Sequence, residues 1–323
     1  MTAISVVVAT RDRAHRLGTV LDALGRLPER PDVIVVDNGS GDGTGVLVRE
    51  RYPHVRLIML PTNRGATARN VGVAAAGTPY VAFADDDSWW EPGSLATAVR
   101  RFEAYPRLAL IAARTLVGTG GRPDPVSEFM ARAPLGREPD LPGPSVLGFL
   151  ACAAVVRRDA FLAAGGYDPV VFFMGEEARL AYDLAAAGWG LAYCDDVVAR
   201  HCPQGGGGRA GLARRNAVLT GWLRRPLRFA LAQTRRLAAD AVDDPAARRA
   251  LAGVLARLPA ALWHRRRPHP AVEAALERLA AEEVAAGYST TAHAHRQAES
   301  RTTSSVGRIT AGSMDSSAAS RSS

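Results

Sequence analysis

Three consecutive aspartates, Asp85, Asp86 and Asp87, follow the apolar run at residues 81–84. The run has the composition of a buried strand, so the three carboxylates emerge together where that strand ends. Adjacent carboxylates repel one another, and a divalent cation is a direct way to neutralise such a cluster. We therefore predict that these aspartates bind Mg²⁺ or Mn²⁺ together with a phosphorylated ligand. A solvated acidic turn is the alternative for three acids taken alone.

Strand-length apolar runs lie at residues 3–9, 33–36, 55–60, 80–84, 108–113 and 189–194. Helical periodicity occupies the segments between the first four runs, and residues 14–26 are the clearest example. Apolar strands that alternate with helices predict an α/β fold, in which a mostly parallel sheet carries helices on both faces. Residues 116–147 are rich in Gly and Pro and show little periodicity, so we expect a long surface loop there.

Polar residues follow each of the first four runs. They are Thr10, Arg11 and Asp12 after the first, Asp37 after the second, Asn63 and Gly65 after the third, and the aspartates after the fourth. Because ligands of parallel sheets bind beyond the carboxyl ends of the strands, these side chains should border one site. Two further groups come later, namely the acid pair Glu176–Glu177 at the start of a predicted helix and His201 after the last strand. Acids in the first turn of a helix also complement its dipole, which gives the pair a structural alternative.

All 40 Lys and Arg positions of this 323-residue chain are arginine. The lack of lysine excludes a Schiff base to pyridoxal phosphate, a lysine-type aldolase and a Walker A phosphate loop. Cys152, Cys194 and Cys202 have no CxxC spacing, which indicates reduced thiols in packing roles and a cytoplasmic setting. The start of the chain has no basic leader, and its apolar stretches are too short to cross a bilayer.

Charge is distributed unevenly along the chain. Residues 1–205 carry 21 Arg and 23 acidic residues, a balance of −2, whereas residues 206–323 carry 19 Arg and 9 acidic residues, a balance of +10. Helices are expected in the second part at about 210–224, 227–239, 245–258 and 270–286. We predict an α/β domain over residues 1–204, an Arg-rich helical extension over 205–286 and a disordered tail over 287–323.

An ordered series of motifs runs from about Ile4 to His201. It comprises Thr10-Arg11-Asp12, the stretch VVDNGSGDGT at 35–44, Asn63-Arg64-Gly65 with Arg69-Asn70, Asp85-x-Asp87 with Pro92, Arg157-Arg158, Gly165-Gly166-Tyr167-Asp168, and Gly175-Glu176-Glu177 before the final histidine. In this order and at these spacings the chain resembles the family 2 glycosyltransferases of the GT-A fold. The resemblance implies a GT-A type, Rossmann-like catalytic domain that performs inverting, nucleotide-sugar-dependent transfer.

The resemblance also implies a metal site. Asp85 and Asp87 would hold Mn²⁺ or Mg²⁺, and His201 would be a third metal contact. Asp85 and Asp86 would in addition border the phosphate and ribose of the donor. A divalent cation at this position stabilises the negative charge that develops on the departing nucleoside diphosphate.

The acid pair resembles the base motif of the family. An acceptor hydroxyl must lose its proton as it attacks the sugar, so the site needs a general base. The resemblance implies that Glu177 is this base and that Glu176 is an acceptor contact or a support for it. Arg179 and Asp183 reverse the charge pattern that the family often shows after the pair, which leaves the acceptor side open.

The donor pocket follows from the same resemblance. Asp37 would accept a hydrogen bond from the base of the donor nucleotide. The residues that would frame the same pocket are Thr10, Arg11, Asp12, Asn63, Gly65 and Arg69. Arg69 suits phosphate or base contacts because its planar guanidinium can donate two hydrogen bonds together. A plain turn before a helix is the alternative for Asn63-Arg64-Gly65.

The sequence leaves several alternatives for the acceptor and for the class of protein. A hydroxyl acceptor could be a cell-envelope glycan, a lipid-linked sugar or a small secondary metabolite. A non-catalytic carbohydrate-binding or scaffold protein on a degenerate transferase fold is the alternative from another class. A nicotinamide-dependent dehydrogenase is disfavoured, because the first strand is followed by Thr-Arg-Asp-Arg rather than by Gly-x-Gly-x-x-Gly. A sugar nucleotidyltransferase would need a Gly-rich N-terminal loop with a lysine.

The basic extension suggests two roles. Trp222, Leu223 and Phe229 alternate with arginines, as interfacial segments do, so one prediction is peripheral contact with the inner face of the plasma membrane. The other is that the helices pack on the catalytic domain and keep their arginines in solvent. No nucleic-acid partner is expected, since only the charge favours one and no reader motif is present.

Overall fold

The structure of the chain, a computed structural model, describes residues 3–118, 120–203, 210–267 and 269–285. Its strands are β1 (Ile4–Thr10), β2 (Asp32–Asp37), β3 (Arg56–Met59), β4 (Tyr80–Ala84), β5 (Ser88–Trp90), β6 (Leu108–Val117), β7 (Arg122–Pro123), β8 (Ala154–Arg157) and β9 (Gly190–His201). Its helices are α1 (Ala14–Gly25), α2 (Thr44–Arg51), α3 (Ala68–Ala75), α4 (Ser94–Ala104), α5 (Pro125–Ala131), α6 (Arg158–Ala163), α7 (Glu176–Ala186), α8 (Ala210–Arg224), α9 (Leu227–Asp240), α10 (Pro245–Trp263) and α11 (Pro270–Ala285). The predicted tail at 287–323 lies outside the described residues.

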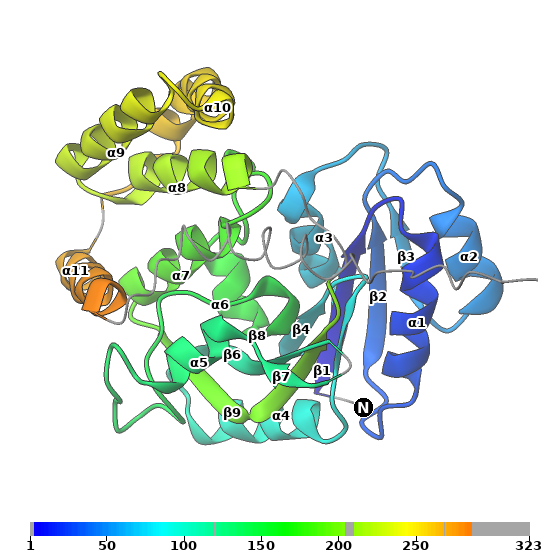
Figure 1. Cartoon of the computed structure of the whole chain (residues 1–323). Coiled ribbons are helices and arrows are strands. Elements are labelled where there is room, and N and C mark those ends of the chain that lie inside the picture. Colours follow the sequence, from blue (N-terminus) through cyan, green and yellow to red (C-terminus); the bar gives the residue numbers. More distant parts are fainter. Residues whose placement is uncertain (1–2, 119, 204–209, 268, 286–323) are drawn as a thin grey trace, which may run out of the picture.

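The strands form one sheet in the order β3-β2-β1-β4-β8-β6-β9-β5, and β7 pairs with β6 (Figure 1). β1 runs parallel to β2 and β4, and β6 runs parallel to β9. β8 lies antiparallel between β4 and β6, so β6 and β9 again run in the direction of β4. The carboxyl end of β9, with His201, therefore reaches the same side of the sheet as the aspartates after β4. The predicted mostly parallel sheet is confirmed.

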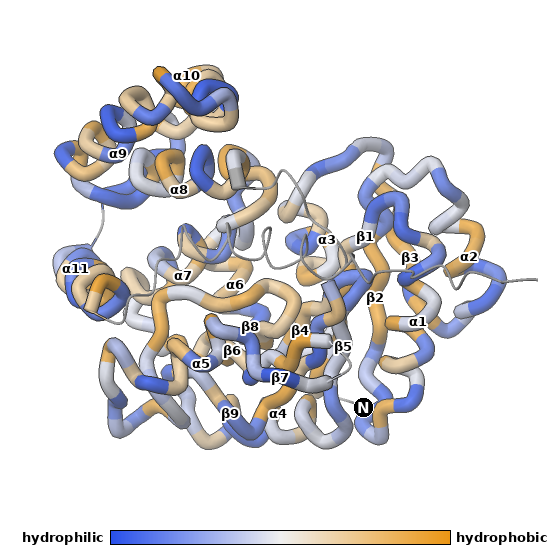
Figure 2. Tube along the Cα trace, in the orientation of Figure 1, coloured by the Kyte–Doolittle hydropathy of each residue, from blue (hydrophilic) through white to orange (hydrophobic). Residues whose placement is uncertain are grey.

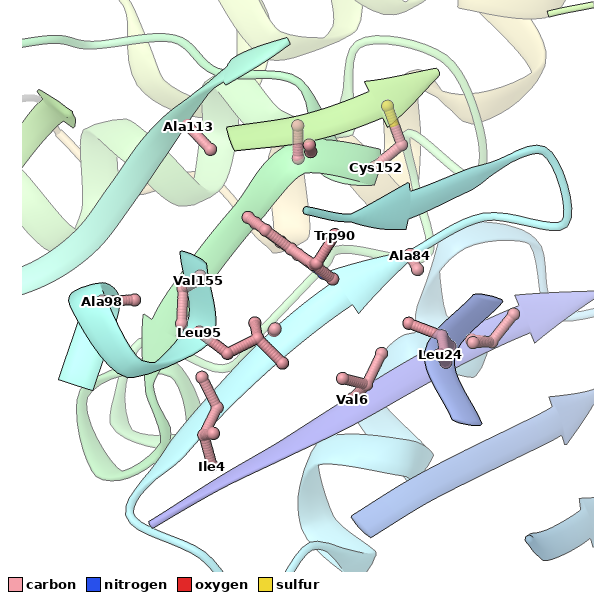
Figure 3. Packing of buried hydrophobic residues seen from close by; sticks show 14 of the residues in the cluster. Ile4, Val6, Leu24, Ala84, Trp90, Leu95, Ala98, Ala113, Cys152 and Val155 are labelled. Atoms are coloured by element: carbon pink, nitrogen blue, oxygen red, sulfur yellow. The ribbon is translucent and has the colours of Figure 1, made fainter. Parts of the chain in front are cut away.

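The core has two layers, one on each face of the sheet. Val6 and Val8 of β1 belong to one layer, and Val7 between them belongs to the other, as the alternation of side chains along a strand requires. Trp90 is fully buried in the first layer, where its indole N–H donates to the carbonyl oxygen of Phe83 at 3.1 Å (Figure 3). The central strands consist largely of hydrophobic residues, as Figure 2 shows for β2. This double burial explains why the strands read as uninterrupted apolar runs.

The loop expected at 116–147 is only partly irregular. It contains β7 and the helix α5, which begins with Pro125 after Asp124. The Asp124 carboxylate accepts a hydrogen bond from the backbone N–H of Val126 at 2.8 Å, so an N-cap followed by proline starts this helix. The strands expected at 108–113 and 189–194 also run further, to Val117 and His201, because their distal halves pair with each other and with β5.

The helical extension packs on the catalytic part through two apolar contacts. Residues of α8, α9 and α10 form a cluster with Val170 and Val171, and α11 places Val272 and Leu276 against Leu147. Trp222 is only 8% exposed and Leu223 is fully buried in the first of these clusters. Trp222 and Leu223 are therefore interior, which corrects the prediction of membrane contact for these two residues, whereas Leu227 and Leu231 further along the segment are exposed. No helix in the described ranges is both long and apolar enough to span a bilayer.

Candidate active site

A cavity of about 420 Å³ lies beyond the carboxyl ends of β1 and β4, opposite the first turn of α7. Eleven of the predicted site residues line it, namely Thr10, Arg11, Asn63, Gly65, Arg69, Asp85, Asp86, Asp87, Glu176, Glu177 and His201. Residues separated by up to 191 positions, Thr10 and His201, thus border one space, as the parallel sheet requires. Asp12 and Asp37 do not line it. The roles assigned to these residues stay predictions.

The three aspartates have different surroundings. Asp85 forms an ion pair with Arg69, and the Thr10 hydroxyl donates to Asp86 at 3.0 Å. Asp87 lies 3.4 Å from Arg16 Nη1. Burial, reinforced by the charges of the two flanking aspartates, raises the pKa of Asp86 to about 6. The charge repulsion inferred from the sequence is therefore partly relieved by Arg16 and Arg69, and the part that remains contributes to the raised pKa of Asp86.

Arg69 connects the aspartates to the acid pair. Its side chain is 4% exposed, and its Nη1 lies 3.4 Å from Glu176 Oε1 while its Nη2 contacts Asp85. The guanidinium also lies 5.8 Å from the ring centroid of Tyr167. A planar fork can bridge two carboxylates in this way, whereas an ammonium group is a single point charge. The donor contact predicted for Arg69 stays a prediction, because the structure directs both terminal nitrogens to protein carboxylates.

Asn38, which the sequence analysis did not select, organises the turn at 63–65. Its side-chain amide donates to Asn63 Oδ1 and to the carbonyl oxygen of Gly65, both at 3.1 Å, and its Oδ1 accepts from the backbone of Arg64. Gly65 has a φ of +58°, and a Cβ there would lie 2.3 Å from the carbonyl oxygen of Phe172. Only glycine fits this position.

Asp12 and Asp37 support the neighbouring turn. Asp37 is 1% exposed and accepts the backbone N–H of Ser40 at 2.9 Å. The exposed Asp12 accepts the N–H of Gly41 at 2.7 Å. Both carboxylates thus stabilise the loop between β2 and α2, and their contact with a nucleotide base stays a prediction.

The acid pair begins α7, directly after Gly175, whose φ of +79° lies in the left-handed region. Glu176 is 2% exposed, and burial together with the charge of Glu177 raises its pKa to about 8. Desolvation also raises the pKa of the half-buried Glu177. Acids that serve only the helix dipole remain ionised in solvent, so the helix dipole alone does not account for the burial of Glu176 against Arg69.

His201 lies beside the aspartates, with its Nε2 3.4 Å from Asp87 Oδ1. Burial favours the neutral imidazole, but the hydrogen bond and the charge of Asp87 outweigh it and raise the pKa of His201. Register explains the position, because Ser88 of β5 pairs with His201 at the end of β9. The short strand β5 thus brings the histidine next to the aspartates.

The remaining walls of the cavity come from segments with no motif of their own. Leu150, Cys152 and residues 172–174 form an apolar wall, and Arg13 and Arg16 add positive charge near the aspartates. No local signal in the sequence predicts these residues, because their position depends on contacts between distant segments.

The reversed charges after the acid pair have a structural explanation. Asp183 lies 2.9 Å from Arg179 Nη2 and 2.5 Å from Arg224 Nε, and Arg224 belongs to α8. All three side chains are buried. This ion pairing attaches the helix that carries the acid pair to the helical extension.

Residues 5–163 match the family model described as Glycosyl transferase family 2. The N-acetylglucosaminyl-diphospho-decaprenol L-rhamnosyltransferase of Mycobacterium tuberculosis is 29% identical over an alignment of 272 residues, which covers 71% of this chain and 89% of that protein. The chain belongs to glycosyltransferase family 2. This glycosyltransferase is also 32% identical, over 202 residues, to the pre-mycofactocin glycosyltransferase of M. tuberculosis, and the match covers 59% of this chain and 40% of that one.

Solved structures support the fold of this glycosyltransferase. The mannosyltransferase PcManGT from Pyrobaculum calidifontis, in complex with GDP-Man and Mn²⁺, superposes with a TM-score of 0.52 at 21% identity, covering 93% of this chain and 80% of that one. S. aureus TarS 1–349, in complex with UDP-GlcNAc, gives a TM-score of 0.54 at 16% identity, covering 79% and 72%. The expected GT-A type fold is confirmed.

Burial of Glu176 predicts a pH-dependent stability. The folded protein keeps its proton up to a pKa of about 8, whereas the unfolded chain loses it near the ordinary value of 4.5. Because the folded state binds more protons between these values, the free energy of unfolding should fall as the pH rises through this window, by roughly 2–4 kcal/mol. Glu176→Gln should flatten this dependence in urea unfolding at pH 5 to 8. If the free energy of unfolding falls as steeply with pH in Glu176→Gln as it does in the exposed control Glu103→Gln, the raised pKa does not belong to Glu176.

Proposed function

We propose that this glycosyltransferase moves a sugar from a nucleoside diphosphate to a hydroxyl acceptor, with inversion at the anomeric carbon. The observation that carries the proposal is that one cavity is bordered by two carboxylate groups in different surroundings. The aspartate cluster faces protein cations at the end of β4, and the acid pair is desolvated at the start of α7. Carboxylates that lie beside cations and carboxylates that are desolvated suit different steps of one reaction.

The donor side is the part of the cavity near the aspartates. Arg11, Arg13 and Arg16 line it and complement the charge of a diphosphate. Thr10 and the turn held by Asn38 would border the nucleoside. Asp37 would reach the nucleotide base from the turn that it stabilises.

The carboxylates and the histidine at this end of the cavity fit a divalent cation that also binds the diphosphate of the nucleotide sugar. Asp87 and His201 lie 3.4 Å apart, while Asp85 is turned toward Arg69. Within the described residues, no three acidic, His or Cys side chains converge on one point. Mg²⁺ commonly binds one or two carboxylates and completes its shell with waters and substrate phosphates, so a partial protein set is what such a site requires. Mn²⁺ or Mg²⁺ held by Asp87 and His201, with Asp85 at hand, would withdraw charge from the leaving diphosphate.

The acceptor side is the part near the acid pair. Glu177 takes the proton of the acceptor hydroxyl while the hydroxyl oxygen forms a bond to the anomeric carbon. The bond from that carbon to the diphosphate oxygen breaks, and its electron pair leaves with the nucleoside diphosphate. One displacement with one base inverts the configuration. The contact of Arg69 Nη1 with Glu176 Oε1, at 3.4 Å, supports a role for Glu176 as the partner that orients Glu177 and the acceptor.

We further propose an acceptor of the cell envelope, such as a lipid-linked sugar, with the enzyme in the cytoplasm at the inner face of the membrane. The name of the 29% identical rhamnosyltransferase, which specifies a decaprenol-linked substrate, supports this class of acceptor. The name of the pre-mycofactocin glycosyltransferase supports the alternative of a small metabolite. A non-catalytic scaffold would hydrolyse no nucleotide sugar in the presence of Mn²⁺.

Asp87→Ala should abolish the metal-dependent part of donor binding. The change removes a carboxylate that would hold the cation shared with the diphosphate, so affinity in Mn²⁺ should fall by about 10-fold or more, toward the affinity in EDTA. Calorimetric titration of both proteins with nucleotide sugars measures this. Asp195→Ala, at an exposed carboxylate on β9, is the matched control. Equal Mn²⁺-dependent binding by Asp87→Ala and by the control would remove Asp87 from the metal site.

Glu177→Gln should stop turnover and spare donor binding. The amide keeps the shape of the side chain but cannot accept a proton, so kcat should fall by about 10²–10⁴-fold while the donor Kd changes little. Glu128→Gln, at an exposed first-turn acid of α5, is the control for a helix-terminal charge. Glu176→Gln should be less damaging. Should Glu176→Gln alone abolish turnover, the base would be Glu176.

A further inference from the structure

The loop before the acid pair is conformationally strained. Phe172 and Met174 have φ values of +69° and +74°, in the left-handed region that side chains other than glycine rarely adopt. Such a conformation costs on the order of 1–3 kcal/mol per residue and persists only where the surroundings impose it. Residues 172–174 line the cavity directly before Glu176 and Glu177.

Two parts of the molecule hold this loop from opposite sides. On the donor side, the backbone N–H of Ala66 donates to the carbonyl oxygen of Phe172 at 2.6 Å. On the other side, the side-chain amide of Asn216 in α8 donates to the carbonyl oxygens of Phe173 and Met174, at 2.5 and 2.6 Å. Asn216 is fully buried. The two carbonyls that lead into the acid pair are therefore held by the helical extension.

A neighbouring arginine sets the orientation of the Asn216 amide. Arg215 Nε donates to Asn216 Oδ1 at 2.8 Å, and Arg215 Nη2 donates to the carbonyl oxygen of Val171 at 3.3 Å. With its oxygen occupied by a donor, the amide must direct its NH₂ group at the loop. A carboxylate at position 216 would instead oppose two carbonyl oxygens.

We infer that Asn216 is a positioning residue for the acceptor side of the active site. Through it, α8 imposes the strained conformation of residues 172–174, and with it the shape of the apolar wall and the placement of Glu177. The catalytic consequence rests on the proposed function, whereas the positioning does not. The helical extension therefore helps to set the geometry of the active site through Asn216.

Amide hydrogen exchange tests the positioning without reference to activity. Asn216→Asp should raise exchange in a peptide covering residues 170–177 by about 10-fold or more, while the sheet stays protected. Thr220→Val is the matched control, since the buried Thr220 hydroxyl, one turn further along α8, has no hydrogen-bond partner among the described residues. If Asn216→Asp does not fold, Asn216→Ser, which retains one donor, should show a smaller rise. Unchanged exchange in the Asn216 variant that folds, or an equal rise in Thr220→Val, overturns the inference.

Kinetics test the consequence. With the nucleotide sugar that the wild-type protein consumes, chosen from UDP, dTDP and GDP sugars, Asn216→Asp should lower kcat by about 10-fold or more and change the donor KM less than threefold. Thr220→Val should leave both unchanged. An Asn216 variant with wild-type kcat contradicts the catalytic consequence. A wild-type protein that consumes no sugar contradicts the proposed function, while the exchange result still decides the positioning.

A second inference rests on the outer face of α10. The buried side of this helix carries Ala247, Ala250, Val254 and Ala261, whereas its exposed side includes larger apolar residues. Leu255, Leu262 and Trp263 are 55%, 47% and 89% exposed. A helix that only covered a core would place its largest apolar side chains inward, so the arrangement marks a surface that contacts something else.

The charge of this region selects the partner. Residues 245–267 include six arginines and no acidic residue, and Arg249, Arg266 and Arg267 are exposed around the apolar side chains. Figure 1 shows α10 at the outer end of the extension, away from the sheet. An exposed Trp and Leu set bordered by arginines is typical of helices that lie in the interface of an anionic bilayer.

We propose that the exposed face of α10 docks on an anionic membrane surface. Trp263, Leu262 and Leu255 would enter the acyl boundary, and the arginines would contact lipid phosphates. This surface replaces Trp222 and Leu223, which are buried, as the predicted membrane contact.

Vesicle sedimentation tests the docking. The full chain should sediment with phosphatidylglycerol-containing vesicles at low salt, much less with phosphatidylcholine alone, and about 10-fold less when Leu262→Gln and Trp263→Gln are combined. Met59→Gln, at an exposed apolar residue of β3, is the control and should bind as the wild type does. Absence of sedimentation, or binding that the double variant retains, overturns the proposal. A concentration-dependent dimer that the double variant abolishes would assign the face to a second copy of the chain.

Discussion

The active site depends on one buried guanidinium between two groups of carboxylates. Asp85 and Glu176 come from elements 91 positions apart, and both meet Arg69. Without that cation, an aspartate cluster and a desolvated acid pair would border one cavity with no fixed positive charge between them. Leaving a buried charge without its partner typically costs several kcal/mol, so Arg69 constrains the start of α3, the end of β4 and the start of α7 together.

Much of the framework could be predicted from the sequence because its signals are local. The strand at 80–84 and the start of the helix at Glu176 follow from apolar runs and from a glycine before two acids. The residues after each strand share one edge of the sheet whatever the details of packing. The strand β5 and the distal half of β9 were missed, since their short or polar sequences become strands only by pairing with each other.

The features that could not be predicted from the sequence depend on contacts between distant segments. The chemistry of Arg69 alone predicts a phosphate ligand, yet its terminal nitrogens contact the carboxylates of Glu176 and Asp85. Asn38 and Asn216 carry no motif, and each is informative only through the backbone groups that it contacts. In the extension, the predicted helices lie near their observed bounds, except that α10 continues through Pro259 to Trp263 instead of ending at 258. Burial of Trp222 and exposure of Trp263 are set by how those helices pack.

The central claim is that the cavity binds an activated sugar through a cation that protein and diphosphate share. Isothermal titration of the purified chain with a panel of UDP, dTDP and GDP sugars, in Mn²⁺ and in EDTA, tests it most directly. We expect at least one nucleotide sugar to bind with a Kd in the micromolar range in Mn²⁺ and at least about 10-fold more weakly in EDTA. Binding of no member of the panel, or equal affinity with and without the metal, would contradict the account.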